Sequence, residues 1–310
     1  MIRARALVIL ALASPGLLAD ALVIAHRGAS AYLPEHTLPA VAMAYAMGAD
    51  YIEQDVVLTK DEVPVVLHDL HLETTTDVAA RFPGRARQDG HYYVIDFTLA
   101  EIRALRVGER RRDNGDPLFP DRFPVGVDVL RVPTLTEQIE LIQGLNQSTG
   151  GNTGIYVELK HPDFHEAAGM SIAASVLQVL YAYGYNDSGD RVYLQCFDEG
   201  TLRFLGDHTK IRLVQLLEDE DLTVERAREI ATYAQGVGPW IRHLADRAEF
   251  VVAAQEAGIE VHPYTFRADR LPRGFRSYRA LLDTFIRDME VDGVFTDHPD
   301  ITRRYVDSLP

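Results

Sequence analysis

The sequence is poor in cysteine, in basic residues and in long hydrophobic segments. Its 310 residues include one cysteine, Cys196, so no intramolecular disulfide can form. Apart from a short stretch near the N-terminus, no segment approaches the ~20 apolar residues that a membrane-spanning helix needs. Lys and Arg number 31 against 46 Asp and Glu, which gives a formal net charge of −15. The composition therefore argues against stable membrane insertion and against nucleic-acid binding through phosphates.

The N-terminus has the pattern of a secretory signal peptide. Arg3 and Arg5 precede an apolar run over 6–19, and small residues follow at 18–21. A basic start, a short apolar middle and small residues at the end are typical of such leaders. We therefore expect residues 1–20 to be removed and the mature chain to be periplasmic or secreted. The alternative is that this segment is a first buried strand.

Strand-like and helix-like patterns alternate along most of the chain. Short apolar runs predict eight strands, centred near residues 23, 53, 156, 194, 214, 237, 262 and 294. Helical patterns cover 38–47, 134–145, 165–183, 199–205, 222–233, 244–257 and 278–290. Eight alternating strands predict a TIM-type (β/α)8 barrel with its active site at the carboxyl ends of the strands. A doubly wound open sheet would need a glycine-rich phosphate turn after the first strand, and there is none.

Two features interrupt this alternation. Only 58–62 separates the strand over 50–57 from a further run over 63–67, so we expect an antiparallel hairpin. With Lys60 and Asp61 at the turn centre, Glu53 would lie opposite His68. The segment 69–132 is rich in Arg, Asp, Gly and Pro, with a short helical pattern over 98–105. We expect it to be a small inserted subdomain in a single barrel domain over 21–310. It would serve either as a cover of the site or as a surface excursion.

Polar residues at the ends of the predicted strands are the candidate site residues. They are His26 and Arg27, Glu53 and Asp55, Glu158 and Lys160, Gln195, His262 and Tyr264, and Asp297, with His68 closing the hairpin. Three carboxylates at one barrel mouth would repel one another unless a cation were bound. The oxygen ligands of Glu53, Asp55 and Glu158 favour Ca²⁺, with Mg²⁺ as the alternative. A zinc site on His26 and His68 is a weaker option.

Arg27 and Lys160 add positive charge to the same mouth, which suits a phosphoryl group. His26 and His68 could then act as base and acid in the cleavage of a phosphodiester. With both pKa values near the unperturbed 6.5, activity should be bell-shaped around neutral pH. Cys196 lies in an apolar run without a basic neighbour, so we expect a small buried core residue and no nucleophilic thiol.

Several motifs together resemble the glycerophosphodiester phosphodiesterase family. They are His26-Arg27-Gly28-Ala29, Pro34-Glu35, Glu53-x-Asp55, His68-Asp69, Glu158-x-Lys160, His262-Pro263-Tyr264-Thr265 and Phe295-Thr296-Asp297. The insertion, with Asp77-Val78-Ala79 and Arg81-Phe82-Pro83, resembles the periplasmic, calcium-using bacterial branch. The chain departs from the family pattern at His36, where Asn is common, at Asp61-Glu62, where Asp-Gly is common, and at Tyr264, where Trp is common.

The resemblance implies hydrolysis of glycerophosphodiesters to sn-glycerol 3-phosphate and an alcohol. It implies His26 and His68 as the acid/base pair and Glu53, Asp55 and Glu158 as metal ligands. Arg27 and Lys160 match phosphate-binding positions, and Gln195, His262 and Tyr264 are expected to contact the substrate. The expected partner is a small molecule, and a homodimer stays open. Alternatives are a periplasmic binding protein for phosphate esters and a lyase that stops at a cyclic phosphate.

Overall fold

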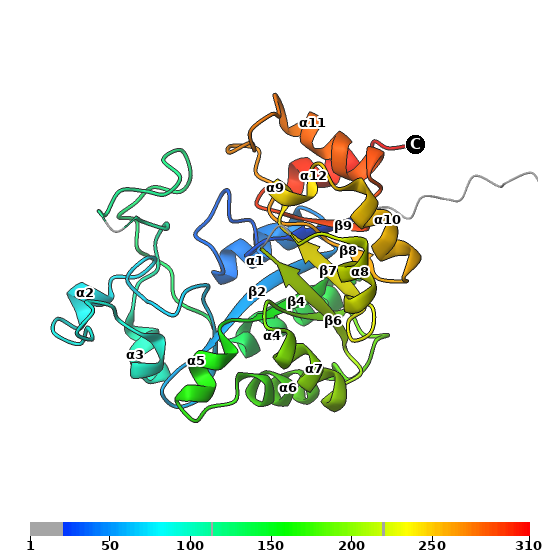
Figure 1. Cartoon of the computed structure of the whole chain (residues 1–310). Coiled ribbons are helices and arrows are strands. Elements are labelled where there is room, and N and C mark those ends of the chain that lie inside the picture. Colours follow the sequence, from blue (N-terminus) through cyan, green and yellow to red (C-terminus); the bar gives the residue numbers. More distant parts are fainter. Residues whose placement is uncertain (1–20, 113, 219–220) are drawn as a thin grey trace, which may run out of the picture.

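The computed structural model describes residues 21–112, 114–218 and 221–310, and shows a nearly closed barrel of eight parallel strands (Figure 1). The predicted signal peptide lies outside the described residues. The parallel strands are β1 (Leu22–Ala25), β2 (Tyr51–Leu58), β4 (Gly154–Leu159), β5 (Val192–Cys196), β6 (Arg212–Leu217), β7 (Gly236–Pro239), β8 (Glu260–Val261) and β9 (Gly293–Thr296). The barrel predicted from the sequence is thereby confirmed.

The strands follow the order β8-β7-β6-β5-β4-β2-β1-β9, with parallel pairing at every step. The ring closes through backbone hydrogen bonds that join the end of β8 and the residues after it to β9 and the residue before it. The Asp292 amide donates to the Val261 carbonyl at 3.1 Å, and the Phe295 amide donates to the Pro263 carbonyl at 3.1 Å. The predicted strand over 259–265 is much longer than the observed β8. The chain nevertheless continues alongside β9 after β8 ends.

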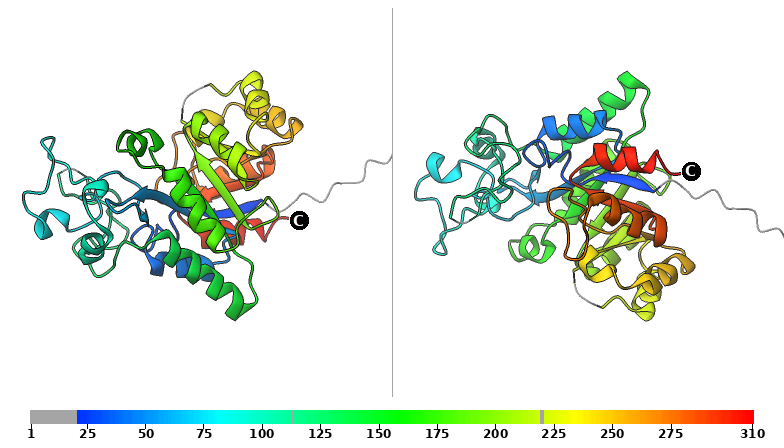
Figure 2. Two further views of the ribbon diagram at one scale, coloured as in Figure 1. Left: turned by 90° about the horizontal axis from the view of Figure 1, so that it is seen from below. Right: turned by 90° about the horizontal axis from the view of Figure 1, so that it is seen from above.

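Helices follow the strands and cover the outside of the barrel (Figures 1 and 2). They are α1 (Leu38–Ala46), α4 (Leu135–Thr149), α5 (Pro162–Ala167), α6 (Ile172–Ala182), α7 (Glu199–His208), α8 (Val224–Ile230), α9 (Ile241–Leu244), α10 (Ala248–Glu256), α11 (Tyr278–Leu282), a π-helix η2 (Asp283–Asp288) and α12 (Pro299–Val306). The Thr134–Glu137 capping box predicted at the start of α4 is present.

Three helices predicted as continuous are divided in the structure. The pattern over 165–183 becomes α5 and α6, because Gly169 turns the chain at a φ of +79° and the Ser171 side chain caps α6 anew. The pattern over 244–257 becomes α9 and α10, and that over 278–290 becomes α11 followed by the π-helix. Apolar periodicity survives such breaks because both pieces bury the same face against the barrel.

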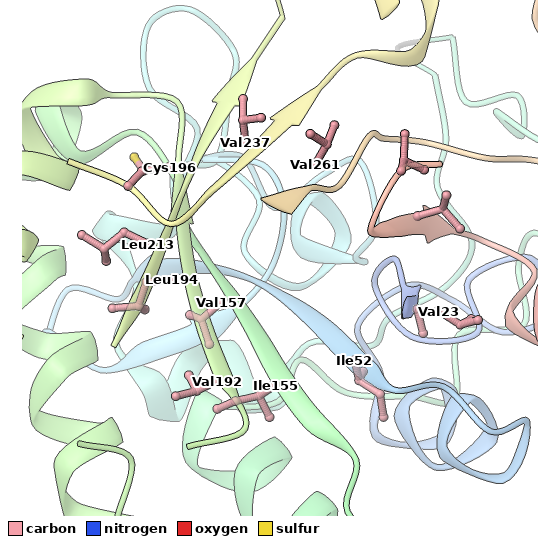
Figure 3. Close-up of a cluster of buried hydrophobic side chains, with 14 of the residues drawn as sticks. Val23, Ile52, Ile155, Val157, Val192, Leu194, Cys196, Leu213, Val237 and Val261 are labelled. Carbon is pink, nitrogen blue, oxygen red and sulfur yellow. The ribbon is translucent and has the colours of Figure 1, made fainter. Parts of the chain in front are cut away.

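Side chains alternate between the barrel interior and the layer under the helices. Figure 3 shows outward-facing side chains of successive strands in that layer, among them Ile52, Val157 and Leu194. The interior holds a separate cluster that includes Tyr51, Tyr156 and Tyr193, and the rings of the last two stack with centroids 4.7 Å apart. Two residues further along the same three strands come the polar side chains Glu53, Glu158 and Gln195. The alternation thus places a hydrophobic plug directly below a polar mouth.

The hairpin forms as predicted, but its register differs by one residue. Strand β3 (Pro64–Val66) pairs antiparallel with β2, and Val56 lies opposite Val66. The turn has three residues rather than two, with Glu62 in the left-handed region at a φ of +59°. Extending this register puts Gln54, not Glu53, level with His68. The predicted pairing of Glu53 with His68 is therefore wrong.

The segment 69–132 stands to one side of the barrel, with α2 (Val78–Arg81), a 3-10 helix η1 (Val94–Asp96) and α3 (Leu99–Ala104) (Figures 1 and 2). It has its own hydrophobic cluster, built around residues such as Leu72, Phe97 and Ile102, into which the hairpin residues Val57 and Val65 also pack. The hairpin therefore anchors this segment beside the barrel mouth.

Two further expectations concern membranes and Cys196. Among the described residues, no helix has both the length and the apolar character needed to span a membrane. The Cys196 thiol is buried in the outer cluster, and burial raises its pKa to about 12. The side chain is a core residue as predicted, and such a pKa disfavours the thiolate that a nucleophile needs.

Candidate active site

A pocket lies at the carboxyl ends of the barrel strands, where this fold builds active sites. Ten side chains were given a role from the sequence, and eight of them line this pocket: His26, Arg27, Glu53, His68, Glu158, Lys160, Gln195 and Tyr264. A second pocket shares His26, Arg27, His68 and Arg267 with the first and continues against the inserted segment at Arg110, Phe119 and Arg122. The mouth of the barrel and the insertion therefore enclose one continuous polar region.

Each of the two candidate acid/base histidines is paired with an aspartate. Nδ1 of His26, at the end of β1, lies 2.7 Å from Oδ1 of Asp297. Nδ1 of His68, after β3, lies 2.5 Å from Oδ1 of the adjacent Asp69. An ionised carboxylate only accepts hydrogen bonds, so in both pairs Nδ1 carries the proton and Nε2 is left as the nitrogen for a ligand.

The environment keeps both imidazoles neutral at pH 7. Burial and the charge of Arg27 lower the pKa of His26 to about 4, against the opposing effect of Asp297. Burial, Arg27 and Lys160 lower the pKa of His68 to about 3. The expectation of unperturbed values near 6.5 is therefore wrong, because two cations and the loss of water both disfavour imidazolium.

Carboxylates crowd the floor of the pocket on β2 and β4. Burial and the charge of Asp55 raise the pKa of Glu53 well above its usual value. Burial, together with repulsion from Asp55, raises the pKa of Glu158 to about 7, although Lys160 opposes the shift. Burial opposes ionisation of Asp55, but the charges of Lys160, His68 and Arg27 and the hydrogen bond from His36 together hold its pKa well below the usual value. This pattern is that of a site with more negative charge than its own cations neutralise.

Such a carboxylate group fits a hard divalent cation. Ligand atoms of His36, Glu53 and Asp55 lie within 4.8 Å of one another, and all three residues are buried. Oδ1 of Asp55 is buried and accepts no hydrogen bond, although Nζ of Lys160 lies 3.7 Å away. A carboxylate oxygen without a hydrogen-bond donor is a ready metal ligand. The structure thus groups two predicted ligands with His36, while Oε1 of Glu158 receives a hydrogen bond from Lys160 at 2.6 Å.

A second candidate metal group, formed by His71, Glu73 and His91, lies in the inserted segment. The His71 and His91 rings are stacked, with centroids 4.1 Å apart and planes 7° from parallel. Imidazole lone pairs lie in the ring plane, so parallel rings do not direct them at one point, as a tetrahedral zinc site requires. The side chain of His91 is also hydrogen-bonded to Glu73. The barrel mouth is therefore the better candidate.

Arg27 is fixed at the edge of the pocket by acidic partners. Its Nη1 donates to Oε1 of Glu35 at 3.1 Å, and its Nε lies 3.2 Å from Oδ2 of Asp55. Its own backbone amide donates to Oε2 of Glu53 at 2.7 Å, and its backbone is in the left-handed region at a φ of +59°. One residue thus contributes both a guanidinium for an anion and an anchor for the carboxylate group.

The three predicted substrate contacts differ in position. Gln195 lines the pocket, and its buried Oε1 has no hydrogen-bond partner. Tyr264 also lines it, on an apolar side shared with Phe197 and Trp240. His262 does not line the pocket. It is fully buried, and its Nδ1 lies 3.0 Å from the hydroxyl of Tyr156 in the barrel interior. His262 and Tyr264 are two residues apart and so share a face; the difference is one of depth, since a step of two residues along the chain leads from the plug to the mouth.

Several residues of the site were not assigned a role from the sequence. Asp69 and Asp297 stood in the quoted motifs, each next to a strand end, and that position was the available signal. His36 was noted only as a departure from the family pattern, yet its Nε2 lies 2.7 Å from Oδ2 of Asp55. Arg110 and Arg122 come from the irregular insertion, where no periodic pattern marks them.

Comparisons with known proteins agree with this geometry. Residues 26–301 match the Glycerophosphoryl diester phosphodiesterase family. A glycerophosphodiester phosphodiesterase of Haemophilus influenzae is 40% identical, over 91% of this chain and 88% of that protein. One of Treponema pallidum is 34% identical, over 94% and 93%.

Solved structures have the same fold. The crystal structure of a Silicibacter pomeroyi protein assigned to the glycerophosphoryl diester phosphodiesterases has a TM-score of 0.73 and 29% identity, covering 93% of both chains. An Oleispira antarctica phosphodiesterase, solved with the product sn-glycerol-3-phosphate, has a TM-score of 0.68 and 22% identity, covering 93% of this chain and 97% of that one. With a family match over nearly the whole described chain and relatives of 34–40% identity, this protein belongs to the glycerophosphoryl diester phosphodiesterase family of hydrolases.

Proposed function

We propose that the protein hydrolyses glycerophosphodiesters to sn-glycerol 3-phosphate and an alcohol, with His26 and His68 as general base and general acid. The observation that carries this proposal is the pair of imidazoles in one pocket, each fixed at Nδ1 by an aspartate. Two oriented proton carriers beside a guanidinium suit phosphodiester cleavage. Simple binding of a phosphate ester has no need of them.

The two histidines would move protons through Nε2. One neutral imidazole takes the proton of the attacking hydroxyl as the new P–O bond forms. The other, protonated in the complex, gives its proton to the oxygen of the leaving alcohol as the old P–O bond breaks. The negative charge of the bound phosphodiester raises the pKa of a nearby imidazole, so protonation of one ring accompanies binding. Attack by the neighbouring glycerol hydroxyl gives a cyclic phosphate that water then opens, whereas attack by water gives the product directly.

Glu53 and Asp55, with Glu158 or His36, would hold a divalent cation, and Ca²⁺ is our first candidate with Mg²⁺ as the alternative. Such a cation supplies Lewis-acid stabilisation of the phosphoryl oxygens when bound. Arg27 and Lys160 line the same pocket and would neutralise the remaining charge of the phosphate. Gln195 offers an unpaired amide oxygen to a hydroxyl, and Tyr264 offers an apolar surface.

The substrate class is supported by the relatives, since the Oleispira antarctica neighbour was solved with sn-glycerol-3-phosphate. We further propose that the protein acts in the periplasm or outside the cell, in keeping with the leader pattern over 1–20. Whether the protein forms a homodimer can be measured by analytical ultracentrifugation.

Phosphorus NMR of a glycerophosphocholine digest tests the reaction. We expect the substrate signal to be replaced by that of sn-glycerol 3-phosphate. Lasting accumulation of a cyclic phosphate would instead identify a lyase, and unchanged substrate would identify a binding protein. The His68→Gln variant, run in parallel, shows whether any turnover arises in this site.

A further inference from the structure

Two arginines of the inserted segment contact the aspartates that hold the candidate catalytic histidines. Arg110 reaches Asp69, the partner of His68, and Arg122 reaches Asp297, the partner of His26. In each pair the arginine donates to Oδ2, while the histidine is bonded to Oδ1. The insertion thus completes two arrangements of the same kind, arginine to aspartate to histidine.

Arg110 is almost fully committed to carboxylates. Its Nη1 donates to Oδ2 of Asp69 at 2.7 Å, and its Nε and Nη2 bind the two oxygens of Glu35 at 2.9 and 2.7 Å. Glu35 in turn accepts from Arg27. The Arg110 side chain is only 12% exposed. A single residue of the insertion therefore links the phosphate-binding arginine to the aspartate of His68.

Arg122 makes the corresponding contact with the aspartate of His26. Its Nη2 donates to Oδ2 of Asp297 at 2.7 Å, and its Nε and Nη2 bind the two oxygens of Asp269 at 2.8 and 3.1 Å. Its side chain is 5% exposed, packed on the ring of Phe119 at 3.6 Å. Asp297 also accepts from Nε of Arg267, at 2.7 Å. The aspartate of His26 thus has two cationic donors, whereas Asp69 has one.

These contacts decide where the aspartates sit and whether they are charged. Burial alone would raise the pKa of Asp69, but the His68 hydrogen bond and the charge of Arg110 outweigh it. An ionised aspartate held in place accepts the Nδ1 proton and leaves the Nε2 lone pair for chemistry. All three guanidinium nitrogens of each arginine are engaged by the protein, so few donors remain for a substrate.

We propose that Arg110 and Arg122 are positioning residues of the reaction, through which the inserted segment holds the two histidines in their working tautomer. This inference rests on the proposed roles of His26 and His68. It makes the insertion part of the catalytic apparatus, rather than a cover or a surface excursion.

Steady-state kinetics with glycerophosphocholine test the proposal. For Arg110→Gln we expect kcat to fall by about 10- to 100-fold, with KM within about threefold of wild type, as for other residues that orient a reacting ligand. Arg122→Gln should lose less, because Arg267 still holds Asp297. Arg110→Lys should recover part of the loss, since an ammonium keeps the charge but cannot reproduce the fork of bonds to Asp69 and to both oxygens of Glu35.

The neighbouring Arg111 provides a matched control. It pairs with Asp128 inside the insertion at 3.0 Å, away from both histidines, so Arg111→Gln should keep kcat. A purely structural role of the insertion predicts that Arg111→Gln and Arg110→Gln lose activity together, in parallel with thermal stability. A substrate-binding role of Arg110 predicts a rise in KM without the loss of kcat. Either result would overturn the proposal.

Long-range ¹H–¹⁵N NMR of the histidine rings gives a readout that does not depend on turnover. In the wild type we expect His68 as the Nδ1–H tautomer, and in Arg110→Gln a mixture of tautomers. If His68 keeps its tautomer in Arg110→Gln and kcat is also unchanged, the proposal is wrong. If Arg110→Gln does not fold, the same NMR spectra and rate measurements on Arg110→Lys and Arg122→Gln test the proposal instead. Failure of the proposed function looks different, because His68→Gln would then stay active.

Discussion

The hydroxyl of Tyr156 lies 3.0 Å from Nδ1 of His262, inside the barrel and beneath the pocket. Both side chains are fully buried, on β4 and just after β8, and the imidazole also contacts the ring of Tyr193 edge to face. This contact joins opposite walls of the barrel under the site. His262 therefore belongs to the packed interior beneath the site and not to the pocket lining.

The burial of His262 predicts a pH-dependent loss of stability. Burial lowers the pKa of His262 to about 4, while an unfolded histidine titrates near 6.5. Between these values the unfolded chain binds more protons, so the free energy of unfolding falls as the pH drops from 6.5 to 4. At about 1.4 kcal/mol per pKa unit, this one group accounts for up to about 3 kcal/mol.

Urea unfolding of the wild type and of His262→Gln at pH 7, 5.5 and 4.5 measures this effect. Carboxylates with raised pKa values titrate in the same range, so the difference between the two proteins is the quantity to compare. We expect the wild type to lose more stability on acidification than the variant does. Parallel pH profiles would contradict the buried neutral histidine.

Replacement of either candidate acid/base histidine should abolish turnover but not folding. We expect His26→Gln and His68→Gln to lose kcat by about 10²- to 10⁴-fold, the usual range for general acid–base groups. His208→Gln, on the exposed end of α7, is the control and should be fully active. Circular dichroism confirms that the variants fold. A His68→Gln protein with near-normal rates would remove His68 from the mechanism.

The crowded carboxylates predict that a cation stabilises the fold. Ca²⁺ should raise the melting temperature of the wild type, since a ligand that binds only the folded state stabilises it by mass action. Glu53→Gln removes a carboxyl whose pKa is raised by burial and by Asp55, so it should not destabilise the cation-free protein. The rise in melting temperature that Ca²⁺ causes should be much smaller for Glu53→Gln than for the wild type. Glu249 is exposed, so Glu249→Gln should respond like the wild type.

Chelation tests the same site through activity. EGTA should abolish hydrolysis, and added Ca²⁺ should restore it. Full activity in EGTA would argue against Ca²⁺ and turn attention to Mg²⁺, which EGTA binds weakly. Equal Ca²⁺ responses of Glu53→Gln and the wild type would show that the cation does not bind at this carboxylate group.

The leader pattern predicts a processed N-terminus. Expressed with its full sequence in a bacterial host that exports proteins, the chain should be recovered outside the cytoplasm with a mature start near Ala21. N-terminal sequencing measures the cleavage point. A protein that keeps residues 1–20 in the cytoplasm would refute the leader, whereas deletion of these residues should leave activity in vitro intact.

The sequence alone determined the barrel and most of the pocket. Apolar runs separated by amphipathic segments define parallel strands, because each strand and helix must bury its face locally. The polar side chains that end those strands then share one rim, which is why His26, Glu53 and Glu158 could be grouped from spacing alone. The helix breaks and the hairpin register were not predicted. One capping residue or one extra turn residue changes them without changing the apolar pattern.

Only the tertiary structure decided the electrostatic state of the site and the use of the insertion. The low pKa of His26 and the raised pKa of Glu53 arise mainly from burial, which only the packed barrel produces, whereas the charges that add to it, Arg27 and Asp55, are close in sequence. The bonds of Arg110 to Glu35 and of Arg122 to Asp297 span 75 and 175 residues, in a segment without periodicity. The local pattern of residues determines the helices and strands and where they end. Long-range ion pairs depend on how those elements pack, which cannot be predicted from the spacing of residues in the sequence.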